Sequence, residues 1–323
     1  MVSFHFDNDL MDDTLIDDII WSEIKNSTSR GDFVCYLVHT PRNAEYMDNA
    51  HFHLKSLSEE NPLEPLHYFR AIERIKTLAK SGNATAMFHM GKIHAIGIAV
   101  PQDMNVAVSW YEKAIAVGDV RSHSNLGWLY QSGLGVPMNK EKAFELLYYG
   151  ANHGIQTAKA SIALMLLSGE GCTPDIEKGL QLLKEAFNAG YINAGNHLSD
   201  VYFTGKYVPK DTEHAYEWLF KVVEQGDSRT AAILGHHLVA GTHGKTDVEK
   251  GLELLKASID AGYMPAYLWI ASLYKNGNGV EKNLATAKAW YEKGILAGNM
   301  ACQSELEKMH RETSSHLTSR TLH

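Results

Sequence analysis

The chain has 323 residues, of which 45% are hydrophobic and 21% charged, and its formal net charge is −8. This balance is typical of a globular protein with a sizeable core. The negative charge argues against non-specific binding to nucleic acid or to an anionic membrane, because both attract positive surface. No apolar run reaches the length needed to cross a bilayer, so we expect no membrane insertion.

The N-terminal residues and the cysteines indicate where in the cell the protein is expected. Residues 1–9 have neither a basic start nor an apolar stretch, so we expect no secretory signal. The three cysteines, Cys35, Cys172 and Cys302, are far apart and odd in number, which does not fit a disulfide framework. A reducing cytoplasm is therefore the simplest expectation.

Residues 1–46 form an acidic segment. The aspartates between Asp7 and Asp18 all precede the first basic residue, Lys25. Apolar residues from Met11 to Trp21 recur at helical spacing, which favours a short amphipathic helix. We interpret the segment as a cap on the repeats that follow. A docking segment for a partner is the alternative.

From residue 47 onward, three columns of small residues recur every 36 residues. The first column is Gly82, Gly118, Gly154, Gly190, Gly226, Gly262 and Gly298. The second is Gly97, Gly133, Gly169, Gly205, Gly241 and Gly277. The third is Ala71, Ala107, Ala143, Gly179, Ala215, Gly251 and Ala287. Such a fixed period indicates an array, here of seven repeats over 47–298, the first of them degenerate.

Each period contains two helices. In the unit 119–154, apolar spacing predicts a first helix from about Ser122 to Gln131, which Gly133 ends in a left-handed conformation. Pro137 cannot continue that helix, and Asn139 is a good N-cap for a second one. The equivalent caps are Asp103, Asp175, Asp211, Asp247 and Asn283. The third small column lies on the second helices and predicts a close helix crossing.

The motif Leu126-Gly127-Trp128-Leu129-Tyr130, followed by Gly133-Leu134-Gly135-Val136-Pro137 and Lys142-Ala143, resembles the Sel-one-like repeat, a relative of the tetratricopeptide repeat. The resemblance covers 83–298 and extends less closely over 47–82. It departs at His243-Gly244-Lys245, where other units have Gly-Val-Pro. The resemblance implies an all-α fold, a right-handed superhelical α-solenoid of stacked antiparallel helix pairs.

The repeats are followed by two short segments. Residues 299–312 begin like an eighth unit and then turn polar, which predicts a C-terminal capping helix. Residues 313–323 are rich in Ser and Thr and are expected to be a disordered tail.

Several motifs that suggest chemistry do not fit their context. The segment 241–246 looks like a phosphate loop, but the required first glycine falls at Val239 and the segment joins two helices. No pair of the 17 histidines has the i, i+4 spacing with a carboxylate that a helical zinc site uses. We therefore expect no catalytic residue, no metal and no cofactor.

In each first helix, repeat positions 4, 8, 11 and 12 supply the core, and positions 3, 6, 10, 13 and 14 lie on the opposite face. In the tetratricopeptide family that face lines the concave groove. The resemblance therefore predicts partner-binding residues at Phe88, Lys92, Arg121, Trp128, Gln131, Asn196, Asp200, Phe203, Arg229, His236 and Lys275. Trp128 and Phe203 are the predicted anchors, because aromatic residues dominate binding energy. Contact with a neighbouring helix is the alternative for both.

The main functional hypothesis is a scaffold or adaptor that binds a partner protein or peptide on its concave surface. The resemblance implies such a role, often in bacterial signalling, protein quality control or host interaction. An immunity or inhibitor protein against a partner toxin or enzyme is one alternative. A metal-dependent enzyme that uses the groove is another, from a different class. The partner and the oligomeric state are left open.

Overall fold

The computed structural model describes residues 72–73, 75–97 and 100–320, with side chains described up to residue 311. The acidic segment 1–46, most of the first repeat and residues 321–323 lie outside this part of the chain, so the expectations for them stay predictions. The chain divides into two compact units. The N-unit includes residues up to Ala158 and Glu170–Cys172, and the C-unit contains Lys159–Gly169 and the chain from Thr173 onward.

The N-unit is built from consecutive helix pairs. Helical residues 75–80 precede two pairs and the start of α9 (Gln156–Ser168). Within each pair the two helices pack together, and α6 also packs on α7. The pairs are α5 (Ala84–Ile96) with α6 (Met104–Ala116), and α7 (Arg121–Ser132) with α8 (Lys140–Asn152).

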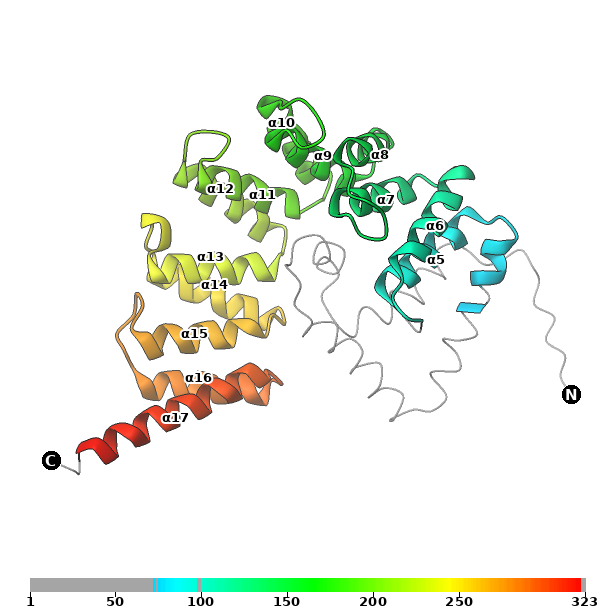
Figure 1. Ribbon diagram of the computed structural model, residues 1–323. Coiled ribbons are helices and arrows are strands. Elements are labelled where there is room, and N and C mark those ends of the chain that lie inside the picture. Colours follow the sequence, from blue (N-terminus) through cyan, green and yellow to red (C-terminus); the bar gives the residue numbers. More distant parts are fainter. Residues whose placement is uncertain (1–71, 74, 98–99, 321–323) are drawn as a thin grey trace, which may run out of the picture. The chain divides into compact units, whose positions relative to one another are not determined.

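The C-unit continues the same pattern (Figure 1). After α9 come α10 (Ile176–Asn188), α11 (Asn193–Thr204), α12 (Thr212–Glu224), α13 (Ser228–Ala240), the short 3₁₀ helix η1 (Thr242–Gly244), α14 (Val248–Asp260), α15 (Pro265–Asn276), α16 (Leu284–Leu296) and α17 (Met300–Arg320). Neighbouring helices pack in chain order from α10 to α17. Over the described ranges the chain has helices and no strand, which confirms the predicted all-α fold of stacked helix pairs.

The helix ends lie where the repeat chemistry predicts them. Asn139 accepts a hydrogen bond from the Lys142 amide at 2.8 Å and so caps α8. The five equivalent residues cap their own helices in the same way. Every glycine of the two glycine columns has a positive φ, between 65° and 98°. Both columns are therefore explained by a backbone conformation that other residues rarely adopt.

The small residues on the second helices face a matching column on the first helices. A Cβ built on Gly235 of α13 would lie 2.6 Å from the carbonyl oxygen of Gly251 of α14, and the reverse distance is also 2.6 Å. A Cβ on Gly179 of α10 would lie 2.9 Å from the carbonyl oxygen of Ala163. The two helices of a pair therefore approach backbone to backbone, and the predicted close crossing is confirmed. The matching column is Gly91, Gly127, Ala163, Ser199, Gly235 and Ala271.

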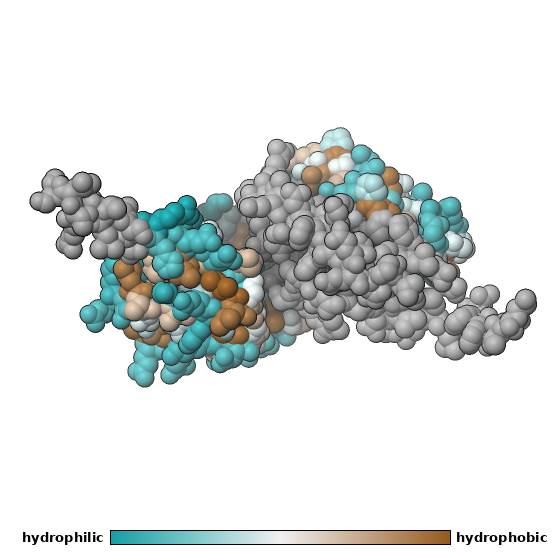
Figure 2. Space-filling model, turned by 90° about the horizontal axis from the view of Figure 1, so that it is seen from below, coloured by the Kyte–Doolittle hydropathy of each residue, from teal (hydrophilic) through white to brown (hydrophobic). Residues whose placement is uncertain are grey.

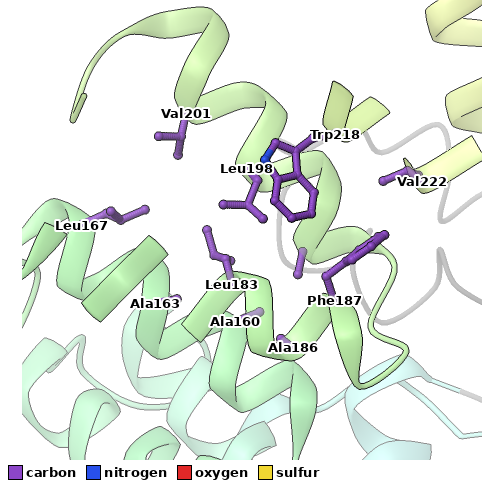
Figure 3. Close-up of a cluster of buried hydrophobic side chains, with 11 residues drawn as sticks. Ala160, Ala163, Leu167, Leu183, Ala186, Phe187, Leu198, Val201, Trp218 and Val222 are labelled. Carbon is purple, nitrogen blue, oxygen red and sulfur yellow. The ribbon is translucent and has the colours of Figure 1, made fainter. Parts of the chain in front are cut away.

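Apolar side chains fill the space between successive pairs. In the C-unit, one buried cluster draws residues from α9, α10, α11 and α12. Figure 3 shows Leu183 of α10 and Leu198 of α11 pointing into the space between these helices. Phe187 meets Trp218 edge to face, with ring centroids 5.5 Å apart. The core is thus shared between repeats, as expected for units that cannot bury an apolar face alone.

The C-terminal helix α17 begins where the capping helix was expected and continues past residue 312 to Arg320. It therefore includes part of the segment that was expected to be a tail. That segment is rich in Ser and Thr but contains neither Gly nor Pro to end a helix. Glu307 occupies the place in α17 that Gly235 and Ala271 occupy in α13 and α15. A charged side chain there is incompatible with a close helix crossing, in keeping with a cap.

Substitution of Gly226 tests the left-handed helix ends. Gly226 has a φ of 86°, and a Cβ built on it would meet nothing within 4 Å. An added methyl group would therefore cause no clash, and the cost would come only from the left-handed backbone conformation. Gly226→Ala should lower the free energy of unfolding by about 1–2 kcal/mol. Gly226→Asn should lose less, because Asn tolerates this conformation. Chemical denaturation measures both, and equal stability of Gly226→Ala and the unaltered chain would refute the assignment.

The buried His89 of α5 makes stability depend on pH. Burial, together with the nearby positive charges of Lys92 and Arg121, lowers the pKa of His89 from 6.5 to about 3. Between these values the unfolded chain binds the proton and the folded chain does not, so stability is lost as the pH falls below 6.5. From pH 7 to pH 5 the loss from this residue should be about 2 kcal/mol.

The variant His89→Gln should lose clearly less stability over the same pH range, as measured by urea denaturation at each pH. His310→Gln, an exposed position on α17, is the matched control and should keep the pH dependence of the unaltered chain. Identical pH dependence in His89→Gln and the unaltered chain would show that His89 does not carry this effect.

Candidate functional site

The predicted partner-binding residues all lie on first helices. The N-unit carries Phe88 and Lys92 on α5, and Arg121, Trp128 and Gln131 on α7. The C-unit carries Asn196, Asp200 and Phe203 on α11, Arg229 and His236 on α13, and Lys275 on α15. We call this the first-helix face of each unit. The structure brings several of its residues into contact within a unit.

In the N-unit, two cations gather on one aromatic ring. The Arg121 guanidinium carbon lies 4.5 Å from the centroid of the Phe88 ring, and the Lys92 Nζ lies 5.5 Å from it. Phe88 is only 9% exposed and belongs to a core cluster with Leu126 and Leu129, so little of its surface is open, and a role in partner binding stays a prediction. Both cations lie over the Phe88 ring, whose electron-rich face attracts them in cation–π contacts.

Arg121 is held in one orientation by Asp119, which the sequence analysis missed. The Asp119 Oδ2 accepts hydrogen bonds from Arg121 Nε at 3.0 Å and Nη2 at 2.7 Å. Its Oδ1 accepts from the Ser122 amide and hydroxyl, so this buried carboxylate also caps the start of α7. Arg121 Nη2 donates further to the Thr85 hydroxyl at 2.9 Å. The Arg121 side chain is nevertheless 36% exposed, against 4% for Asp119.

A signal for Asp119 exists in the sequence. Acidic or amide residues stand at the first repeat position in several units, and each accepts a hydrogen bond from a backbone amide two or three residues on. These residues are Asn83, Asp119, Asp227 and Asn299. At Asp119 the same carboxylate also binds Arg121.

The predicted anchors Trp128 and Phe203 are half-buried. Trp128 packs against the core cluster that contains Leu126 and Leu129. Phe203 meets Tyr216 of α12 edge to face at 5.3 Å. Both side chains therefore make contacts with neighbouring helices, which was the alternative considered for them. A role of their remaining exposed surface in binding stays a prediction.

The other predicted residues of the C-unit have varied surroundings. The Asn196 Oδ1 accepts a hydrogen bond from the Thr230 hydroxyl at 3.1 Å, which links α11 to α13. The Asp200 side chain is exposed, and Arg229 is half-buried. His236 lies edge to face with Trp269 at 5.9 Å. The Lys275 Nζ lies 3.5 Å from a carboxylate oxygen of Glu305.

Phe203 is also the centre of a cluster that sequence reasoning missed. The imidazole of His243 stacks on its ring with centroids 4.2 Å apart, and the ring of His237 lies 6.3 Å away. Burial and the nearby His243 and His236 lower the pKa of His237 from 6.5 to about 4. The sequence showed His243 only as part of an irregular turn. Its contact with Phe203 depends on how α11 and α13 stack, which the sequence pattern does not reveal.

A second set of aromatic residues lies away from the first-helix face, in the N-unit. Tyr149 of α8 is stacked between His123 and His153, with each pair of ring centroids 4.1 Å apart. Tyr148 and Tyr149 are both exposed. On the side of the molecule shown in Figure 2, apolar residues are interspersed with hydrophilic ones on the described surface.

Two further observations concern the described residues only. They contain no group of three or more His, Cys, Asp or Glu side chains placed to hold a metal ion. In the same ranges, no helix combines the length and apolar character that crossing a membrane requires.

Comparison with known proteins identifies the repeat. The model of the Sel1 repeat matches residues 84–119, 120–155, 158–191, 193–227, 230–263 and 265–299. No curated protein matches the sequence. A Sel1 repeat protein from Oxalobacter formigenes has a similar crystal structure, with a TM-score of 0.57 and 24% identity over 73% of this chain and 100% of that chain.

Two further solved structures have lower TM-scores. The protective antigen c5321 of uropathogenic Escherichia coli, which displays an SLR fold, has a TM-score of 0.41 and 24% identity over 84% of this chain and 68% of that chain. The immunity protein Pa5087 from Pseudomonas aeruginosa has a TM-score of 0.43 and 19% identity over 69% of this chain and 84% of that chain. The repeat matches span most of the described residues, and the chain belongs to the Sel1 repeat family.

Proposed function

We propose that this protein is a protein-interaction scaffold or adaptor and that a partner protein or peptide binds its first-helix face. The observation that carries the proposal is the setting of Arg121. Its guanidinium is fixed by Asp119 and Thr85 above Phe88, yet more than a third of the side chain is open to solvent. An ordered arginine loses little conformational entropy on binding, which favours its use as a contact residue.

The repeat architecture supports the same proposal. The close crossings and the shared core use the small and apolar columns of each unit. Outside those columns, the side chains at positions 3, 10 and 13 include Arg121, Trp128, Asp200, Phe203 and His236, which are half-buried or exposed. Aromatic residues and arginine are the types that contribute most at protein interfaces. Polar side chains around them supply specificity.

Two more specific roles share this surface. An adaptor holds a partner in place, whereas an immunity or inhibitor protein blocks a toxin or an enzyme. Both use the same contacts and differ only in the partner, so identification of the partner separates them. Catalysis by a metal-dependent enzyme would instead require a metal, and metal analysis of the purified protein tests that alternative.

The test alters the first-helix face of both units in one variant. We expect the double change Gln131→Arg and Asp200→Arg to reduce recovery of a specific partner from lysate about tenfold or more, which corresponds to about 1.4 kcal/mol. Asp200 is exposed and Gln131 is half-buried, and neither belongs to the core, so the thermal melting temperature should stay close to that of the unaltered chain. Quantitative mass spectrometry of the captured proteins gives the readout.

The matched control carries the same change of charge on second helices. Gln181 of α10 and Glu217 of α12 are exposed, and Gln181→Arg with Glu217→Arg should leave partner recovery unchanged. Equal loss in both variants would show that net charge, and not the first-helix face, governs binding. Loss in the control alone would assign binding to the second-helix side, where Tyr148 and Tyr149 are exposed.

A further inference from the structure

The turn between α13 and α14 differs from the equivalent turns of other repeats. His243 stands where three of those turns have Gly135, Gly171 and Gly279, whose φ angles are 69° to 73°, and where the turn between α11 and α12 has Tyr207. Its own φ is 62°, and among the described residues no other non-glycine has a positive φ. A side chain in this region of the backbone costs free energy. The turn therefore stores conformational strain that glycine would avoid.

The side chain of His243 covers an aromatic ring. Its imidazole stacks on Phe203, with the ring planes 25° apart, while His243 itself is exposed. Tyr216 and His237 also meet the Phe203 ring, both edge to face. One face of Phe203 is thus sheltered from solvent by a residue on a strained turn.

Both flanks of the turn are attached to α12, and its tip is not crowded. The Tyr216 hydroxyl donates a hydrogen bond to the Thr242 carbonyl at 2.8 Å, and the Lys245 Nζ pairs with Glu213 at 2.7 Å. A Cβ built on Gly244 would meet nothing within 4 Å. Rotation at His243 and Gly244 can therefore move the imidazole without displacing the flanks.

Proline restricts the backbone of four equivalent turns, at Pro101, Pro137, Pro174 and Pro209. Residues 242–247 contain no proline, and neither does the turn at 278–283. At Gly135 and Gly171 a Cβ would also collide with the backbone of the preceding repeat, near Met104 and Lys140 respectively. The turn at His243 has room for a side chain and lacks the proline that restricts the backbone.

We propose that His243 and Gly244, at the tip of the turn between α13 and α14, form a lid over Phe203. In the closed state, which the structure shows, the His243 imidazole covers the ring. In the open state His243 leaves the left-handed conformation, and the ring becomes available to a partner on the first-helix face. Relief of strain compensates in part for the lost stacking, so a minor open state is populated and a partner can select it. The use of the lid in binding rests on the proposed function, whereas the lid motion does not.

The lid is tested without any partner. A 4-fluorophenylalanine at position 203 reports on its surroundings by ¹⁹F NMR, and a soluble paramagnetic chelate reports on its access to solvent. We expect exchange broadening on the microsecond-to-millisecond scale in the otherwise unaltered chain. In His243→Gly this exchange should vanish, and relaxation of the label by the chelate should rise about threefold or more, because the lid is lost.

Two further variants keep the test decisive. His243→Ala removes the imidazole but keeps the left-handed position occupied, and it should expose the label as His243→Gly does. His214→Ala on α12 removes an exposed histidine that does not cover Phe203 and should leave the label unchanged. Unchanged access to the label in both His243 variants, or a label in the unaltered chain that shows no exchange, would overturn the lid. Neither outcome bears on partner recovery, so failure of the lid and failure of the proposed function are distinguishable.

Discussion

The close crossing of the two helices within each repeat is the constraint on which the rest of the structure depends. Gly235 and Gly251 approach so closely that a single added carbon on either would lie 2.6 Å from a backbone oxygen of the other. With the helices this near, the apolar side chains that flank the crossing reach the next repeat and form a shared core. The small column does not continue into α17, where Glu307 stands in its place.

The crossing also determines which side chains are available for function. Positions that pack within or between pairs are restricted to small or apolar residues, and variation is confined to the remaining positions. On the first-helix face these carry the Arg121–Asp119 pair of the N-unit and the Phe203–His243 stack of the C-unit. Each combines a residue fixed by packing with one that is open to solvent, so a rigid repeat can present specific contacts.

Most of the fold was predictable from spacing, and only part of the candidate site was. The N-caps at Asn139 and its equivalents, and the left-handed glycines, follow from local chemistry that a 36-residue period exposes. Phe88 is buried because side chains of α6 and α7 pack against it, and that packing depends on how the helices stack, which spacing along one helix does not show. The contact of His243 with Phe203 joins positions 40 residues apart and breaks the glycine pattern, so no periodic signal could indicate it.

The central claim is that close crossing at small residues holds each repeat together, and side-chain size at Gly235 tests it most directly. Stability measured by chemical denaturation should fall stepwise from Gly235 to Gly235→Ala to Gly235→Val, with the last costing about 3 kcal/mol. Ala257→Val, at an exposed position on α14, should change stability by only about 0.5 kcal/mol. Equal stability of Gly235→Val and Ala257→Val would contradict the account, because the crossing would then tolerate bulk.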